Sequence, residues 1–220
     1  MAKHIDYWAV LRPGLCYHIY NHAVGSENLF REVDNYRFFI ERFNYYFEEY
    51  VQLYAYCLMP NHFHLLLQLK EITPAIESNM RQEANQAAHA YLEGAGAIRT
   101  FYETQFRRFF TSYSRAYGKK YNRTGSLFQA KFKRTIIHNE MQFWNKLCYI
   151  HHNPIHHGFS KDYESWPYQS YKFYLQKDTS TVNTDAVLRR LGDSLSEQRS
   201  QFAQMHINYQ KDIQSYYLIP

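Results

Sequence analysis

The sequence predicts an α+β fold in which helices pack on one face of an antiparallel sheet. Three segments with strand character, at residues 16–23, 51–58 and 62–69, are arranged with one helical segment in the order strand, helix, strand, strand. Only the turn Met59–Asn61 separates the last two strands, which suits an antiparallel pair. With 220 residues, 45% of them hydrophobic, the chain can bury the core of one domain and carry an appendage.

Helices are predicted where apolar side chains recur at helical spacing. Asp34 has the character of an N-cap, and the segment Tyr36–Tyr50 that follows places its aromatic side chains on one face. Two further helices are expected at residues 73–92 and 104–120, with Gly94–Gly96 as the break between them.

The next part of the chain predicts a turn, an extended segment and a helix. Asn122–Gly125 has turn composition, and Leu127–His138 is expected to be a strand or an extended arm. Asn139 is expected to cap a helix that continues through Ile150. Pro154 should end this helix, because the residue before a proline is disfavoured in helical conformation.

The C-terminal part of the chain differs in composition. Trp166–Tyr171 predicts a packed, irregular segment, and polar residues dominate after Lys177. We therefore expect residues 1–177 to form the main domain and residues 178–220 an extension of one or two short helices. Helical spacing within the extension is shown by Leu188, Leu191 and Leu195.

Cysteine content and hydropathy predict a cytoplasmic protein. The odd number of cysteines, at positions 16, 57 and 148, and the absence of a signal peptide suggest a reducing compartment. No apolar run approaches the roughly 18 residues that a membrane span needs.

Positive charge is concentrated in one window, from Thr104 to Asn139. Of the 25 basic residues nine lie there, and none of the 20 acidic residues does. Such a run is often only a solvated face, but its length and its interleaved Phe and Tyr residues favour contact with a phosphate backbone. The candidates for contact with DNA are Arg107, Arg108, Lys119, Lys120, Arg123, Lys131, Lys133 and Arg134.

Two histidines occur in the third predicted strand, as His62-Phe63-His64. Alternate residues of a strand share a face, so the two imidazoles lie about 7 Å apart on one side while Phe63 points to the other. A pair of imidazoles in this arrangement can bind one metal ion, although a hydrogen-bonded pair in the core is the alternative.

The predicted helix after Asn139 offers a nucleophile and a third ligand. Tyr149 and Asn153 are four residues apart and therefore face the same way. A tyrosine can act as a covalent nucleophile, and an amide oxygen can join two imidazoles and phosphate oxygens around Mg²⁺ or Mn²⁺. A helix cap is the alternative role for Asn153. Packing is expected for Cys148, and core packing or base stacking for Tyr113 and its neighbours at helical spacing.

Four motifs in this order resemble one family. His62–His64 resembles the HUH motif, and Tyr149–Gly158 resembles the Tyr-Ile-x-x-Asn-Pro-x-x-x-Gly signature of the REP-associated tyrosine transposases. Gly125–Lys133 and Trp166–Tyr171 resemble two further stretches of that family. The sequence departs from it at Tyr20–His22, where members commonly carry an Arg-Gly pair.

The resemblance implies a ferredoxin-like sheet, the HUH endonuclease fold, with both histidines on a central strand and the tyrosine on a neighbouring helix. It implies cleavage of single-stranded DNA beside a hairpin. Tyr149 would attack the scissile phosphate to give a 5′-phosphotyrosine and a free 3′-hydroxyl, with His62, His64 and Asn153 around a divalent metal. A hairpin-binding protein without activity and a replication-type nickase remain alternatives, and the sequence leaves monomer and homodimer open.

Overall fold

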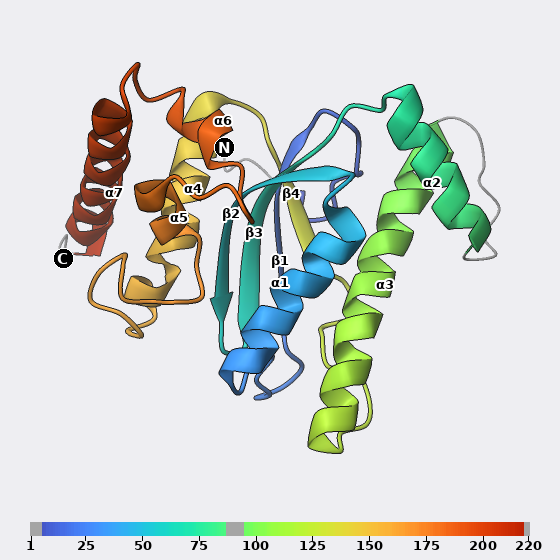
Figure 1. The fold of residues 1–220 in the computed structure, drawn as a ribbon. Coiled ribbons are helices and arrows are strands. Elements are labelled where there is room, and N and C mark those ends of the chain that lie inside the picture. Colours follow the sequence, from blue (N-terminus) through green and yellow to red (C-terminus); the bar gives the residue numbers. More distant parts are fainter. Residues whose placement is uncertain (1–5, 87–94, 218–220) are drawn as a thin grey trace.

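A four-stranded antiparallel sheet forms the centre of the molecule (Figure 1). The computed structural model describes residues 6–86 and 95–217. The strand order is β2-β3-β1-β4, which is the ferredoxin-like arrangement, and every neighbouring pair is antiparallel. The strands are β1 (Cys16–His22), β2 (Val51–Met59), β3 (His62–Leu69) and β4 (Lys133–Ile137).

Helices cover both faces of this sheet. The first face is packed against α1 (Val33–Phe47) and α3 (Ala95–Tyr121), and α2 (Pro74–Gln86) lies beside α3 (Figure 1). The opposite face is packed against α4 (Glu140–His156). The predicted α+β antiparallel class is therefore confirmed, whereas the helices expected on one face occupy two, because α4 binds the face that α1 and α3 leave free.

Strand β3 shows how the two faces divide the side chains. Phe63, Leu65 and Leu67 belong to the core beneath α1 and α3, whereas Leu66 belongs to the core beneath α4. His62 and His64 share the face of Leu66 by strand alternation. Burial on both sides explains why β3 has almost no exposed position.

Several predicted boundaries differ from those in the structure. The N-cap of α1 is Glu32, so Asp34 lies in the first turn. Gly96 lies inside α3 and breaks nothing, while Gly94 and residues 87–92 are outside the described residues. The extended segment is strand only at Lys133–Ile137, and the part before it is irregular.

Helix α4 begins as predicted and ends later than predicted. The side chain of Asn139 caps it by accepting a hydrogen bond from the Gln142 amide. Pro154 was expected to end the helix, and this is wrong, because the helix continues to His156. The proline leaves the Ile150 carbonyl without its usual donor, and Nδ2 of Asn153 lies 3.5 Å from that oxygen. Gly158, with φ of +73°, follows the helix end.

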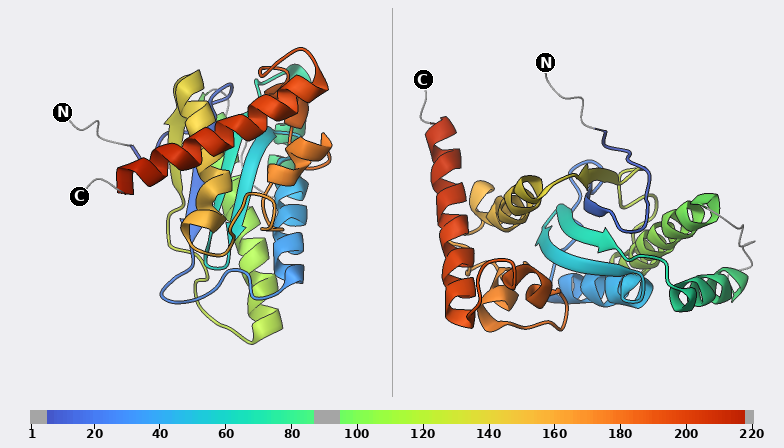
Figure 2. Two further views of the ribbon diagram at one scale, coloured as in Figure 1. Left: turned by 90° about the vertical axis from the view of Figure 1, so that its left-hand side faces the viewer. Right: turned by 90° about the horizontal axis from the view of Figure 1, so that it is seen from above.

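The C-terminal part packs onto the outer side of α4. It contains α5 (Tyr171–Gln176), α6 (Thr184–Leu188) and α7 (Leu195–Tyr217), and α7 crosses α4 (Figure 2). A buried chain of hydrogen bonds joins them, because His151 of α4 contacts His206 of α7 at 2.9 Å and Ser170 at 2.8 Å. The extension is helical, but α7 has 23 residues and is not short, and Leu188, Leu191 and Leu195 fall at the end of α6, between the helices and at the start of α7. The extension contacts the helix that carries Tyr149.

The structure also shows the state of the three cysteines and the character of the helices. Cys16, Cys57 and Cys148 are free thiols. None of the helices in the described ranges combines the length and the apolar character of a membrane span.

Acid should destabilise this packing. Burial lowers the pKa of His206 to about 4 and the pKa of His151 well below the ordinary value of 6.5. The unfolded chain therefore binds protons below pH 6.5 that the folded chain does not accept until about pH 4. The free energy of unfolding should fall as the pH falls through this window, by up to about 1.4 kcal/mol per pH unit for His206.

Urea denaturation between pH 7.5 and 4.5 measures this effect. His206→Gln removes one of the titrating rings and should flatten the dependence, at the cost of lower stability near pH 7. A slope equal to that of the parent chain would contradict the assignment of His206 as a proton-excluding buried ring.

Candidate active site

His62 and His64 project from β3 toward α4. Their ring centroids lie 5.2 Å apart, and the side chains are buried, with 5% and 3% of their surface exposed. The neighbouring strands frame them, since His22 pairs with His62 and Tyr20 with His64 across β1. The predicted shared face is what brings both imidazoles beneath the same helix.

Both histidines use Nδ1 in a contact with a neighbouring side chain, which leaves Nε2 as the nitrogen that could bind a metal. Nδ1 of His62 lies 2.7 Å from Oδ1 of Asn61, an acceptor, so His62 donates through Nδ1 and its Nε2 carries the lone pair. Nδ1 of His64 lies 2.9 Å from Nε2 of His18. If His64 donates in this contact, its own Nε2 is also left with a lone pair, which is the form that binds a metal.

Tyr149 and Asn153 reach this pair from α4. The Tyr149 ring meets the His64 ring edge to face, with centroids 5.4 Å apart. Nδ2 of Asn153 donates to the Tyr149 carbonyl at 2.7 Å, so Oδ1 is the atom of this amide that could serve as a ligand. Asn153 lies in the last turn of the helix, and its donation to the carbonyls of Tyr149 and Ile150 keeps the alternative of a capping role open beside that of a ligand.

Electrostatics link the four side chains. Burial lowers the pKa of His62 to about 3, and a hydrogen bond with Asn153 partly opposes this shift. Burial also holds the pKa of His64 well below its ordinary value. In Tyr149 burial raises the pKa of the phenol, again opposed by a hydrogen bond with Asn153. Both imidazoles are therefore neutral near pH 7, as metal ligands must be.

The donor set fits a divalent metal ion only when Asn153 is included. Within the described ranges, no three His, Cys, Asp or Glu side chains form a metal-binding group. Two neutral imidazoles and the Oδ1 of Asn153 offer three donors of nitrogen and oxygen type, which suits Mn²⁺ and, with additional phosphate oxygens, Mg²⁺.

Side chains that the sequence reasoning did not single out also surround His62 and His64. His22 stacks on His62 with centroids 4.8 Å apart, and His157 lies 5.1 Å from the same ring. His18 and His22 lie four residues apart in β1, so both side chains are on the face of the sheet that carries His62 and His64. Their spacing of four in a predicted strand was the signal that could have found them.

The competing candidates for the nucleophile pack in the core. Tyr113 and Tyr117 donate hydrogen bonds to the backbone carbonyls of Leu29 and Asn28 from buried positions. Burial raises the pKa of the Cys148 thiol to about 12, which makes it unreactive near neutral pH. The expectation of packing for these residues is confirmed.

Half of the predicted DNA contacts form ion pairs within the chain. Their acidic partners lie outside residues 104–139, so the absence of acids from that part of the sequence did not reveal these pairs. The pairs are Arg108 with Glu83 at 3.6 Å, Lys120 with Glu32 at 2.5 Å, Arg123 with Glu27 at 3.0 Å and Arg134 with Glu103 at 3.1 Å. Arg134 also donates to the Ala9 carbonyl and is mostly buried, so it does not project as expected.

The sheet separates the basic residues into two groups. Lys133 lies on the histidine side, where its Nζ is 5.6 Å from the centroid of the Tyr20 ring, and Lys131 is exposed nearby in sequence. Arg107 and Lys119 lie on α3, across the sheet from the histidines. Arg115, which was not among the candidates, lies beside them on α3.

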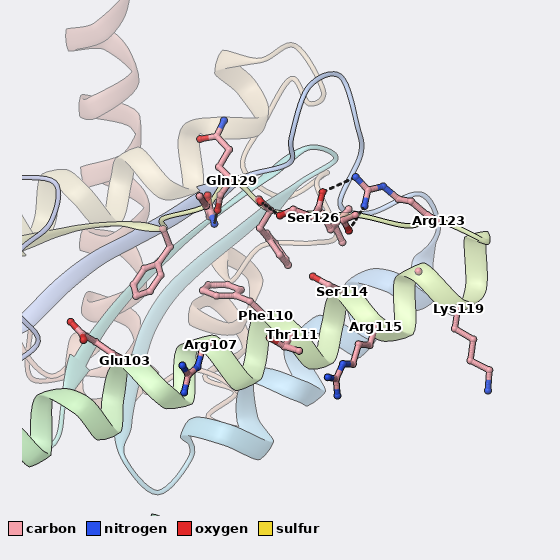
Figure 3. A pocket seen from close by; sticks show the side chains of 17 residues that line it. Glu103, Arg107, Phe110, Thr111, Ser114, Arg115, Lys119, Arg123, Ser126 and Gln129 are labelled. Atoms are coloured by element: carbon pink, nitrogen blue, oxygen red, sulfur yellow. Dashed lines mark hydrogen bonds between the residues drawn. The ribbon is translucent and has the colours of Figure 1, made fainter. Parts of the chain in front are cut away.

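A cavity of about 620 Å³ opens between α3 and the segment 123–132 (Figure 3). Phe110 and Ser114 point from α3 toward that segment, whereas Arg115 and Lys119 point away from it (Figure 3). The lining of the cavity thus combines apolar side chains with several cations and one carboxylate, Glu103.

Two comparisons with known proteins agree on the fold and on the resemblance. No protein-family model matches the chain. Among curated proteins, one of Haemophilus influenzae named "Putative REP-associated tyrosine transposase" is 32% identical over 121 residues. The match covers 53% of this chain and 57% of that relative.

Among solved structures, a REP-associated tyrosine transposase bound to a REP hairpin has a TM-score of 0.55 at 15% identity. The similarity covers 84% of this chain and 90% of that one, and it confirms the fold. The resemblance expected from the four motifs is thus also found in a sequence match that spans about half of this chain and just over half of the curated relative.

Proposed function

We propose that this chain is a REP-associated tyrosine transposase that cleaves and rejoins single-stranded DNA beside a hairpin. The observation that carries the proposal is the meeting of Tyr149 with His64 at 5.4 Å between ring centroids, with the Asn153 side chain donating to the Tyr149 carbonyl at 2.7 Å. Hairpin binding alone would not require this arrangement. The similarity to the two proteins named above supports the substrate class.

In the proposed reaction, the phenol oxygen of Tyr149 attacks the scissile phosphorus. A bond forms between phosphorus and the tyrosine oxygen, the bond to the 3′ oxygen breaks, the phenol loses its proton and the 3′ oxygen gains one. The product is a 5′-phosphotyrosine with a free 3′-hydroxyl, and attack by another 3′-hydroxyl reverses the step. No energy source is consumed, because one phosphodiester is exchanged for another.

His62, His64 and Asn153 would hold a divalent ion, which supplies polarisation of the scissile phosphate. The chain's own contribution is to keep both imidazoles neutral by burial and oriented by Asn61 and His18. Asn153 couples the ligand set to the nucleophile, since it is one helical turn from Tyr149. The outer hydrogen bonds should matter almost as much as the ligands themselves.

The site is complete within one chain. Helix α4 brings Tyr149 to the histidines of its own sheet, which supports action as a monomer. Every residue assigned to chemistry lies within residues 1–177, and the extension at 178–220 braces α4 from behind through His206. We therefore propose that the extension positions the catalytic helix.

Formation of a covalent adduct tests the function. The chain is incubated with single-stranded hairpin oligonucleotides and Mn²⁺ or Mg²⁺, and a protein–DNA species that survives denaturing electrophoresis is expected. If no hairpin yields this species with either metal, the chain binds such DNA without cleaving it or acts elsewhere.

Neutralising the basic residues in and next to β4 should distinguish the side chains that contact DNA from the side chain that stabilises the fold. Lys131→Gln with Lys133→Gln should reduce the slope of log K against log salt by about 1.4, as expected for two single-strand phosphate contacts. Arg134→Gln should leave that slope unchanged and lower the free energy of unfolding by about 1–3 kcal/mol, because the Ala9 carbonyl loses its side-chain donor and Glu103 keeps only Arg99 as an ion-pair partner.

Fluorescence titrations at several salt concentrations and urea denaturation measure the two quantities. An unchanged slope in the double lysine variant would remove these residues from the interface. A reduced slope in Arg134→Gln without loss of stability would show that its ion pair opens to bind DNA.

A further inference from the structure

A second cavity, of about 550 Å³, lies beside the nucleophile. Helix α4 packs mainly on β2 and β3, so it covers less of the same sheet face where β1 and β4 lie. The cavity lies there, between β4 and the first turns of α4. Its lining includes Thr135, Ile137, Gln142, Asn145, Lys146 and Tyr149.

Lys146 is the cationic side chain of this lining. It precedes Tyr149 by three residues, and its Nζ lies 4.3 Å from the centroid of the Tyr149 ring. Its charge also reaches the sheet, because it lowers the pKa of both His18 and His64. Lys146 therefore lies against the Tyr149 ring and lines the same cavity, within electrostatic reach of His18 and His64.

No carboxylate balances this ammonium group. In the part of the chain that the structure describes, Lys146 forms no ion pair. Asp6 lines the cavity as well, but its carboxylate is not within ion-pair distance of Lys146. Burial lowers the pKa of Lys146 with no opposing partner. A partly buried cation without a counterion is favourable chiefly when an anion enters beside it.

We propose that Lys146 binds a non-bridging oxygen of the phosphodiester that Tyr149 attacks, and that the cavity holds the adjoining nucleotide. This inference rests on the proposed function. Placed on the face of Tyr149, the ammonium and the histidine pair would lie on different sides of one phosphate. Phosphoryl transfer is accelerated mainly by positioning and by charges fixed around the non-bridging oxygens, which is what such a residue supplies.

The position of Lys146 is well suited to this role. Its neighbours Phe143, Leu147 and Ile150 are buried in the core beneath α4, which holds this stretch of helix against the sheet. A phosphate-binding group on a packed helix is placed more closely than one on a loop. The cavity is also large enough for one nucleotide, since small-ligand sites begin at about 300 Å³.

DNA binding without chemistry tests the proposal. In a Tyr149→Phe background, Lys146→Met should reduce the slope of log K against log salt for a single-stranded hairpin oligonucleotide by about 0.7, one phosphate contact. Lys146→Arg should retain the parent slope. Lys172→Met is the matched control, because Lys172 is an exposed lysine on α5, and it should leave the slope unchanged.

A substituted oligonucleotide places the contact at the reacting bond. With a neutral methylphosphonate at the linkage mapped by wild-type cleavage, Lys146→Met and its parent should bind with equal affinity. An unchanged salt slope in Lys146→Met, or an equal change in Lys172→Met, would overturn the assignment. If the wild-type chain forms no adduct while Lys146→Met still loses slope, strand transfer fails and the phosphate contact stands.

Discussion

Replacing Tyr149 by phenylalanine should abolish the covalent protein–DNA adduct and leave hairpin binding intact. The substitution removes only the hydroxyl, so the ring that packs against His64 and beneath Lys146 remains. The expected loss of adduct is at least about 1000-fold, since a missing nucleophile cannot be replaced by its neighbours. Denaturing electrophoresis of a labelled oligonucleotide measures the adduct, and anisotropy measures binding.

Tyr45→Phe is the matched control for this variant. Tyr45 is 69% exposed on α1, and the same loss of one hydroxyl there should leave adduct formation unchanged. An adduct that persists in Tyr149→Phe would assign the nucleophile to another side chain. Loss of hairpin binding together with the adduct would mean that the phenol hydroxyl contacts DNA in the ground state.

Replacing His62 or His64 by alanine should weaken metal binding and adduct formation together. Each variant removes one of two imidazoles that burial keeps neutral, and outer-shell partners of metal ligands already account for 10–100-fold effects in other sites. We expect the adduct rate to fall at least about 100-fold. Calorimetric titration of Mn²⁺ into the protein without DNA should show a matching loss of affinity.

Tyr45→Phe again serves as the control, because Tyr45 is exposed on α1 and lines neither of the two cavities. Higher Mn²⁺ concentration should partly restore the adduct in the His62 and His64 variants, as expected when affinity is the quantity lost. If the unchanged chain forms the adduct at full rate with no detectable Mn²⁺ binding, the imidazoles act without a metal.

The sequence was sufficient where local pattern alone decides the outcome. The strand at residues 62–69 has the predicted bounds, and its alternation places His62 and His64 on one face and Phe63 on the other. The cap at Asn139 and the helical spacing of Tyr149 and Asn153 are also as predicted. Periodicity is a property of neighbouring residues, so it can be read without knowledge of the rest of the chain.

Other features of the site required the tertiary structure. Pro154 is tolerated within α4 because the Asn153 side chain lies near the carbonyl that the proline leaves without a donor. The ion pair of Arg134 with Glu103 joins β4 to α3, and no count of charge along one window could reveal it. His18 and Lys146 became relevant only when β1 and α4 were placed beside β3.

The sequence by itself thus determined the fold class, the face shared by His62 and His64, and the candidacy of Tyr149. Only the tertiary structure decided that these three groups meet and that Asn153 joins them from within the helix. It also decided which of the basic side chains remain free to bind an anion. The physical reason is that burial and charge pairing are long-range properties, set by residues that are distant in sequence and adjacent in the fold.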